Sequence, residues 1–378
     1  MPARPVANSA GDPPSASGTA HEHRTRRRKS PPTRKAPAPR ARHPALPCRV
    51  VRAILCRAPG GEEVMELGEV PAPALSPGDV RLRVRAAGVN RADLMQRRGL
   101  YPPPPGASPI LGLECAGEIL ELGAALRTQR SWKPGDRAMA LLAGGGYAEE
   151  VAVDAGSLLP IPERFSFEQA AGVPEVFLTV FLTLFQLGSL SAGNTLLVHG
   201  GGSGIGTAAI QLARAAGARV VVTAGSDEKC QRCLELGAQR AVNYHAGDFV
   251  AACRELSGGA GADVVLDSIG APYLERNLEA LATGGRLVVI GLMGGARAEL
   301  PLAALLARRL QIIGSTLRAR PAADKAALAT AFWARFGGAL ESGEVRPVID
   351  RVLPLAAAAE AHRLLQASAH FGKLILRI

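Results

Sequence analysis

The sequence contains few aromatic residues and no apolar run long enough to span a membrane. Phe, Trp and Tyr make up 4% of the 378 residues, whereas Gly occurs 43 times. This balance is typical of α/β domains, in which small residues let helices pack closely on a sheet. The longest apolar run extends from Val176 to Phe185. Because a spanning helix needs about 20 such residues, we expect no transmembrane segment and no membrane partner.

The cysteines do not form the framework of a small disulfide-bonded domain. The CxxC motif at Cys230 and Cys233 lies in a predicted helix and has no second pair, whereas a closed zinc site needs four ligands. We therefore expect reduced thiols, no metal site and a cytoplasmic protein. The six cysteines are Cys48, Cys56, Cys115, Cys230, Cys233 and Cys253.

Positive charge is concentrated in the first 47 residues. They contain ten Lys/Arg and two Asp/Glu, which gives +8 of the formal net charge of +11 and leaves +3 for the remainder. Residues 1–47 are rich in Pro and Arg and lack apolar periodicity, which predicts a disordered extension. An Arg-rich, acid-poor start is also typical of mitochondrial transit peptides. The run from Arg24 to Lys29 fits a nuclear-import or RNA-contacting patch instead, and these alternatives stay open.

The region from residue 48 to residue 172 is rich in short β-strand patterns. Pro-Gly, Gly-Asp and Gly-Gly breaks separate several of them, which predicts a compact, antiparallel, barrel-like domain. The expected strands are Val50–Leu55, Val80–Val89, Leu111–Leu122, Ala138–Leu142 and Ala148–Val153.

After Gly193 the pattern changes to short buried strands that alternate with helices. This alternation predicts an α/β fold with a doubly wound parallel sheet, which we assign to residues 173–317. Residues 318–378 are expected to return to the first domain, where a last strand at Lys373–Ile378 completes its sheet. The expected strands of the parallel sheet are Thr195–His199, Arg219–Thr223, Ala241–Tyr244, Val264–Ser268 and Leu287–Gly291, with helices at Thr207–Ala216 and Glu228–Leu236.

A glycine-rich turn between a strand and a helix predicts a dinucleotide site. Glycine lets the backbone adopt positive φ and approach a pyrophosphate closely, and the start of a helix offers free N–H groups to that anion. The strict GxGxxG pattern fails, because Ser203 occupies its middle position, but the strand–turn–helix context supports the assignment. The turn contains Gly200, Gly201, Gly202, Ser203, Gly204, Ile205 and Gly206.

The next strand favours NADPH over NADH. An NAD site usually ends this strand with an acidic residue that holds the ribose hydroxyls. Here the strand ends in Thr223, Ala224 and Gly225. Ser226 and Lys229 follow, and the lysine would neutralise a 2′-phosphate.

Beyond these patterns, the chain resembles the zeta-crystallin-type quinone oxidoreductases of the medium-chain dehydrogenase/reductase superfamily. The resemblance extends from about Val50 to Ile378 and rests on several stretches of sequence. They are the run from Asn90 to Gly99, Tyr101 with 102–106, 110–114, Val173-Pro174-Glu175 with Leu178-Thr179, Ser203–Leu212 and Gly291–Gly295.

The resemblance implies a GroES-like catalytic domain, a Rossmann domain, a homodimer and an NADPH-dependent quinone reductase. It implies that Asn90, Tyr101 and Thr179 lie beside the nicotinamide and the substrate. It also implies a cofactor site made of Gly201, Ser203, Gly204, Ile205, Gly206, Ser226, Lys229, Tyr244, Gly291, Leu292, Met293 and Lys373. His370 stands where relatives often carry Asn, which puts a polar contact there in doubt.

Zinc-dependent relatives of this family carry Gly-His-Glu where this chain has Gly112-Leu113-Glu114. Leucine cannot bind a metal, so we expect a zinc-free enzyme that acts on acceptors which take up hydride readily. Asn90 is a candidate to hydrogen-bond a substrate oxygen or the nicotinamide carboxamide, or simply to cap the helix that follows. Tyr101 is a candidate proton donor or a wall of the pocket, and Asp93 is expected to be structural.

Two other functions fit the sequence. One is an NADPH-dependent alkenal or enone double-bond reductase. The other is a dinucleotide-binding protein whose main role is RNA contact, for which the basic extension at residues 1–47 is the only support.

Overall fold

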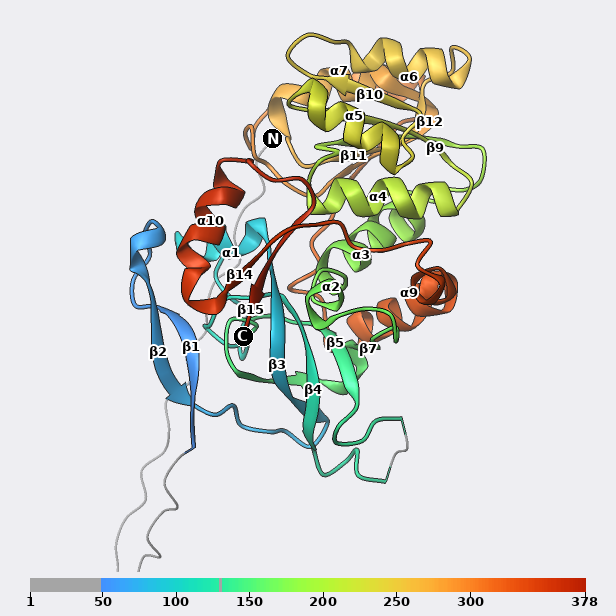
Figure 1. Ribbon diagram of the computed structural model, residues 1–378. Helices are drawn as coiled ribbons and strands as arrows, with labels where there is room; N and C mark the ends of the chain where they lie inside the picture. The colour runs from blue at the N-terminus through green and yellow to red at the C-terminus, as the bar shows by residue number, and fades with distance from the viewer. Residues whose placement is uncertain (1–48, 129–130) are drawn as a thin grey trace, which may run out of the picture. The chain divides into compact units, whose positions relative to one another are not determined.

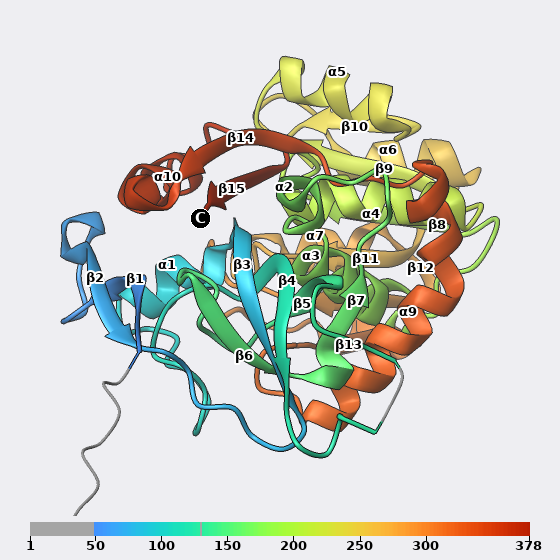
Figure 2. The same ribbon diagram turned by 60° about the horizontal axis from the view of Figure 1, so that its bottom comes forward.

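The computed structural model describes residues 49–128 and 131–378. The predicted basic extension at residues 1–47 and Cys48 lie outside these residues. The described chain contains two large sheets and one small one (Figures 1 and 2).

A seven-stranded sheet forms the first large layer and contains segments from both ends of the described chain. Its strand order is β14-β15-β3-β4-β5-β7, and β6 pairs with β3. β15 pairs antiparallel with β3, so the C-terminal residues supply a strand next to one from the N-terminal half. The strands are β3 (Asp79–Val89), β4 (Glu114–Leu122), β5 (Arg137–Leu141), β6 (Glu150–Asp154), β7 (Leu158–Pro160), β14 (Ile349–Pro354) and β15 (Lys373–Arg377).

A separate antiparallel pair of strands lies before this sheet. β1 (Val50–Cys56) pairs with β2 (Met65–Pro71), a strand that the sequence patterns did not predict. A backbone hydrogen bond of 2.9 Å from Ile54 to Tyr147 ties the pair to the chain before β6.

The second large sheet is parallel throughout, which confirms the predicted doubly wound fold. Its order is β10-β9-β8-β11-β12-β13. Residues alternate along each strand, so Leu196 and Val198 enter one hydrophobic core and Leu197 enters another. The strands are β8 (Thr195–His199), β9 (Arg219–Ala224), β10 (Arg240–Asn243), β11 (Ala262–Asp267), β12 (Leu281–Val289) and β13 (Gln311–Gly314).

Helices cover these sheets and connect the two halves of the chain (Figure 1). In the parallel half they are α4 (Gly204–Ala215), α5 (Asp227–Leu236), α6 (Phe249–Ser257), α7 (Leu274–Ala280) and α8 (Leu302–Ala307). The others are α1 (Arg91–Arg97), α2 (Phe167–Ala170), α3 (Pro174–Val180), α9 (Ala322–Ser342) and α10 (Ala358–Gln366), with a π-helix at Phe181–Leu187 and short 3₁₀ turns at 62–64, 155–157, 271–273 and 355–357.

The expected strand Leu111–Leu122 begins three residues later than the sequence indicated. Gly112 has a φ of +102°, and its N–H donates to the Asp93 carboxylate at 3.0 Å. Because this conformation and this bond turn the backbone away from the ladder, β4 begins at Glu114.

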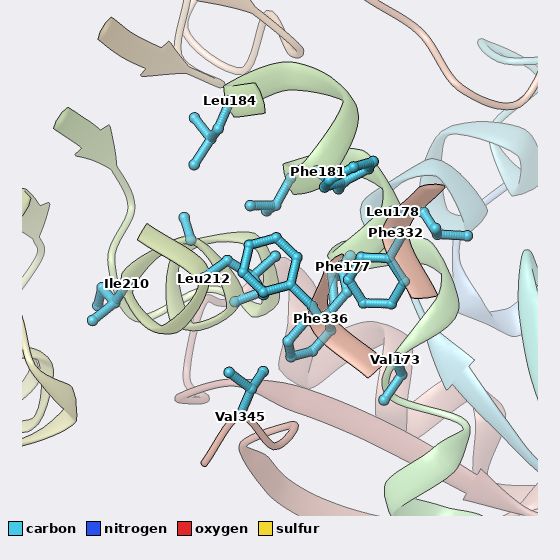
Figure 3. Close-up of a cluster of buried hydrophobic side chains, with 14 of the residues drawn as sticks. Val173, Phe177, Leu178, Phe181, Leu184, Ile210, Leu212, Phe332, Phe336 and Val345 are labelled. Carbon is cyan, nitrogen blue, oxygen red and sulfur yellow. The ribbon is translucent and has the colours of Figure 1, made fainter. Parts of the chain in front are cut away.

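The segment Phe167–Leu187 corrects the expectation that no stretch is long and apolar enough to cross a membrane. It satisfies both criteria by length and composition, and 72% of its most apolar window is buried inside the structure. Figure 3 shows Phe177 and Phe181 from this segment packed with Phe332 and Phe336 of α9. The same ring contacts appear as centroid separations of 5.8–6.4 Å. The apolar residues therefore form a core between α3, α4 and α9.

A buried polar network joins α1 to α10. Arg97 approaches Nδ1 of His362 at 3.2 Å, and Nε2 of His362 approaches the Tyr147 hydroxyl at 3.2 Å. Because arginine only donates, Nδ1 accepts and Nε2 carries the proton. Tyr147 then donates to Asp93 at 3.3 Å. All four side chains are almost fully buried, and this network fixes the start of α1 beside β4.

Candidate functional site

The glycine-rich turn lies between β8 and α4, as the sequence predicted. Gly200 has a φ of +76°, and the Ser203 hydroxyl donates to its carbonyl at 2.7 Å and accepts from the Gly206 N–H at 2.9 Å. A Cβ at Gly206 would overlap the carbonyl oxygens of Gly200 and Gly201. The first N–H groups of α4, at Gly204 and Ile205, have no partner within the helix. The turn therefore fits a pyrophosphate.

The C-terminal segment lies on this turn. The Gly372 N–H donates to the Gly202 carbonyl at 2.8 Å, and Ser203 and Gly372 form a parallel bridge. A Cβ at Gly204 would lie 2.6 Å from Cδ of Lys373, so the lysine stem occupies the space that this glycine leaves. The structure thus brings Lys373 to the predicted phosphate turn.

The ammonium group of Lys373 enters a buried charge cluster of three side chains, which also contains Asn90 and Glu114. Nζ of Lys373 donates to Glu114 Oε1 and to Asn90 Oδ1, both at 2.6 Å, and to the Val89 carbonyl at 3.2 Å. The amide group of Asn90 donates to the same Glu114 oxygen at 3.0 Å. The three side chains are 0–6% exposed, so their charges interact with little screening by water.

Asn90 occupies the N-cap position of α1, but its side chain belongs to this charge cluster. The cap bond comes from Asp93, whose carboxylate accepts the Asn90 N–H at 2.8 Å. Asp93 is therefore structural, as expected. Burial raises the pKa of Asp93 to about 6, although hydrogen bonds from Asn90, Gly112 and Tyr147 and the charge of Lys373 oppose this rise.

Thr179 carries an orphaned hydroxyl near the end of α3. It is 9% exposed, and its Oγ1 has no hydrogen-bond partner among the described residues. A buried polar atom without a partner is rare and usually marks a ligand or a water site. This hydroxyl is free to contact a ligand, and the resemblance implies a nicotinamide beside Thr179.

Tyr101 follows α1 and is held by Arg318, a residue to which the sequence assigned no role. The guanidinium carbon of Arg318 lies 5.3 Å from the centre of the Tyr101 ring. Arg318 also donates to the carbonyl groups of Tyr101 and Ala143, at 3.3 and 2.9 Å, and to Gln96 Oε1 at 2.6 Å. Burial raises the pKa of Tyr101 above its usual value near 10.

The predicted adenosine end contains Ser226, Lys229 and Tyr244. Ser226 caps α5 by accepting the Lys229 N–H at 3.2 Å, and the Lys229 ammonium donates to the Ser368 carbonyl at 2.6 Å. Tyr244 is 45% exposed, and its hydroxyl lies beside Gly225. Asp227, the first residue of α5, accepts a hydrogen bond from Asn243 at 2.8 Å.

The predicted loop Gly291–Met293 follows β12. Leu292 and Met293 are 55% and 54% exposed, while the Met293 N–H donates to the Ser268 carbonyl at 3.2 Å. The backbone of this loop is thus fixed at the C-terminal ends of β11 and β12, where ligands bind in doubly wound sheets.

His370 and the CxxC cysteines take neutral, buried positions. Burial, with Lys229 nearby, lowers the pKa of His370 to about 4, and its Nδ1 has no partner among the described residues. Burial raises the pKa of Cys230 and takes that of Cys233 to about 12. These thiols therefore stay protonated at neutral pH and are unreactive.

Glu114 and Glu175 were quoted in the sequence motifs without a role, and the structure places both in the site. The backbone N–H of Glu175 donates to Glu114 Oε2 at 2.8 Å. One feature of the sequence could have indicated a role for these two residues: each is an acidic residue between apolar neighbours, in Leu113-Glu114-Cys115 and Pro174-Glu175-Val176. Within residues 49–128 and 131–378, no group of three His, Cys, Asp or Glu residues is arranged to hold a metal ion.

Two family models match the chain. The model described as "Alcohol dehydrogenase GroES-like domain" matches residues 76–163, and the model described as "Zinc-binding dehydrogenase" matches residues 204–332. The first match contains strands β3 to β7 of the seven-stranded sheet and confirms the expected GroES-like domain.

Curated relatives and solved structures match over nearly the same range. The rat quinone oxidoreductase is 32% identical over 335 residues, which cover 87% of this chain and 98% of that protein. The Escherichia coli quinone oxidoreductase complexed with NADPH has a TM-score of 0.77 and 29% identity, over 86% of this chain and 100% of that one. A structure described as an NAD-dependent alcohol dehydrogenase has a TM-score of 0.76 and 36% identity, over 86% and 99%.

Proposed function

Because the chain belongs to the zeta-crystallin-type quinone oxidoreductases of the medium-chain dehydrogenase/reductase superfamily, we propose that it reduces quinones with NADPH. The main observation in support is the glycine-rich turn at α4 with Lys373 and the orphaned Thr179 hydroxyl nearby. The turn would bind the pyrophosphate of a dinucleotide, and Thr179 would contact its nicotinamide.

The proposed site divides the work between backbone and side chains. The N–H groups at the start of α4 would hold the pyrophosphate, and Thr179 would hold the carboxamide that orients the nicotinamide. When bound, the nicotinamide supplies the hydride. Asn90 and Tyr101 would line the side that the acceptor enters, so the protein acts mainly by positioning.

The choice of NADPH rests on the end of β9. Thr223, Ala224 and Gly225 offer no carboxylate to the ribose, and Asp227 already accepts a hydrogen bond from Asn243. Ser226, Lys229 and Tyr244 would receive a 2′-phosphate: Ser226 caps the helix that carries Lys229, and the Tyr244 hydroxyl lies beside Gly225. If a 2′-phosphate binds, the Lys229 ammonium would replace its hydrogen bond to the Ser368 carbonyl by a charge-assisted hydrogen bond to the phosphate.

Catalysis without zinc is part of the proposal. Leu113 has no donor atom, and Glu114 is already bonded to Lys373 and Asn90. Without a Lewis acid, acceptors that take hydride readily are the fitting substrates, and quinones are such acceptors.

Steady-state oxidation of NADPH against a panel of small quinones tests the proposed function. We expect turnover with ortho- and para-quinones, and kcat/KM at least tenfold higher with NADPH than with NADH. A simple enone serves as the competing acceptor. Faster turnover of the enone than of every quinone would favour a double-bond reductase, and no saturable change in NADPH fluorescence would refute a dinucleotide site.

A further inference from the structure

Glu175 lies next to the buried charge cluster, at the start of α3. It is the second residue of α3, and its backbone is fixed by the 2.8 Å bond to Glu114. The charges of Glu114, Lys373 and Asp93 act on its carboxyl, and the charge of Glu175 in turn acts on the Tyr101 phenol. Glu175 is therefore close enough to interact electrostatically with the charge cluster and with Tyr101, and we expect Asn90 of that cluster and Tyr101 to lie beside the acceptor.

Glu175 and Thr179 lie on the same face of α3. Residues four apart on a helix are neighbours, whereas Phe177 lies on the opposite side. Phe177 packs against Phe332 of α9 with ring centres 6.4 Å apart (Figure 3). The polar face of α3 thus points away from the aromatic core and carries both Glu175 and the orphaned Thr179 hydroxyl.

The carboxyl group of Glu175 is available for chemistry. It accepts no hydrogen bond in the described part of the chain, whereas Glu114 is fully buried and accepts several. Glu175 is partly exposed, and neither of its carboxyl oxygens is among the fully buried, unpartnered side-chain atoms of the described residues, so solvent reaches the enclosed carboxyl. A carboxyl with one enclosed side and one accessible side can exchange protons with water and present them to a bound molecule.

The environment of Glu175 keeps a proton on it near neutral pH. Burial raises its pKa to about 7, and the carboxylates of Glu114 and Asp93 add to the rise while Lys373 opposes it. On the other face of α3, Phe332 and Phe336 of α9 pack against the segment Phe167–Leu187, and Arg335 of α9 stacks on Phe336. The charged groups that act on the Glu175 carboxyl are Glu114, Asp93 and Lys373, none of which lies on α4 or α9. A general acid works best when its pKa is near the working pH, which favours Glu175 over Tyr101.

We propose that Glu175 is the general acid of the reaction and protonates the oxygen of the reduced acceptor. This inference rests on the proposed reductase function. The acceptor gains two electrons and one hydrogen as the hydride. An O–H bond then forms on the acceptor oxygen while the O–H bond of Glu175 breaks. The resulting carboxylate recovers its proton from water, so one NADPH and one proton are consumed for each quinone reduced.

The pH dependence of kcat in Glu175→Gln tests this role, with Glu168→Gln as the matched control. Glu168 lies on α2 and pairs with Arg377 at 2.8 Å, outside the site. With saturating NADPH, we expect wild-type and Glu168→Gln rates to fall about tenfold per pH unit above pH 7. Glu175→Gln should lose about 10²-fold at pH 6 and show no such decline, because glutamine donates no proton as an acid.

Infrared difference spectra between pH 5 and pH 9 give a readout that does not depend on turnover. A protonated-carboxyl band that titrates near pH 7 should be present in the wild-type protein and in Glu168→Gln and absent in Glu175→Gln. If Glu175→Gln does not fold, Glu175→Asp keeps the carboxyl and should keep the wild-type pH profile at a lower rate.

The outcomes separate this inference from the proposed function. Turnover of quinones by wild-type protein with an unchanged rate and pH profile in Glu175→Gln would refute the role of Glu175 alone. A wild-type carboxyl band that is unaffected by the substitution would do the same. Absence of turnover in the wild-type protein would refute the proposed reductase function and this inference with it.

Discussion

Arg318 connects the segment that contains Tyr101 to three other parts of the chain, at Gln96, Ala143 and Lys325. Its guanidinium contacts the Tyr101 ring and donates to Tyr101, Ala143 and Gln96, while its own carbonyl accepts from Lys325 at 2.6 Å. A planar group with several fixed donors holds a loop in one orientation. We infer that Arg318 positions Tyr101 and does not touch the acceptor.

Replacement of Arg318 by Met should loosen this loop. We expect KM for the quinone to rise about tenfold, with the Kd for NADPH unchanged, because loss of positioning weakens acceptor binding in the transition state. Arg320→Met is the control, since Arg320 only donates to the nearby Thr316 carbonyl. An equal loss of NADPH affinity would indicate a general structural role instead.

At this scale the sequence predicted the backbone part of the site better than its side-chain part. The turn from Gly200 to Gly206 was predicted from a glycine-rich run between a strand and a helix, because backbone conformation leaves a local signature. Lys373 was named only by resemblance, and its bonds to Asn90 and Glu114 join residues 259–283 positions apart. A local sequence pattern does not indicate which distant charged residues contact one another in the fold. The charge cluster could therefore be identified only from the structure.

Between elements, the contact of α1 with α10 depends on a histidine that stays neutral. Burial, with Arg97 and Arg98 nearby, lowers the pKa of His362 to about 3. An unfolded histidine binds a proton below about pH 6.5. Between these two values the unfolded state binds more protons than the folded state, so acid reduces the stability of the fold.

Chemical unfolding of wild-type protein and His362→Gln between pH 4 and pH 8 measures this dependence. Above pH 6.5 the histidine should contribute no pH dependence. Below it, the wild-type protein should lose about 1.4 kcal/mol per pH unit more than the variant, the value for one proton. His245→Gln is the control, because His245 is exposed, and it should keep the wild-type slope. Parallel slopes in all three proteins would contradict a neutral His362.

The sequence predicted several strands of both large sheets closely. β8 was predicted to the residue, β3, β5, β9 and β10 to about one residue, and β11 to about two, because these buried strands are short apolar runs with clear ends. β12 begins at Leu281, earlier than the predicted start at Leu287. β2, β13 and the split of 167–187 into α2, α3 and a π-helix were missed. The residues of β2 and β13 are largely exposed, and those of 167–187 are mostly apolar. Neither the two-residue period of a strand nor the 3.6-residue period of a helix can therefore be recognised in these segments.

At the scale of the whole molecule, the edge of the parallel sheet is the exposed feature that fits the expected homodimer. β13 is an edge strand, and the residues around it include Leu302, Leu306 and Ile312, which are 66%, 81% and 39% exposed. An edge strand with exposed apolar side chains is a template for pairing with another chain. We propose that two copies associate through β13 and α8.

Light scattering after gel filtration tests this association. We expect a dimer for the wild-type protein and a shift toward monomer for Leu306→Glu, because a buried unpaired carboxylate opposes association. Leu234→Glu on α5 is the control, since Leu234 is also exposed, at 39%, and lies away from β13. A monomeric wild-type protein, or a dimer unaffected by Leu306→Glu, would refute this interface.

The position of β15 also bears on how the chain folds. This strand lies between β14 and β3, and Lys373 on it bonds to Asn90 and Glu114, which lie 283 and 259 positions earlier in the sequence. Because contacts between such distant residues require the closure of a long loop, they form slowly. A refolding chain should therefore regain its local helices before it regains the buried ammonium group.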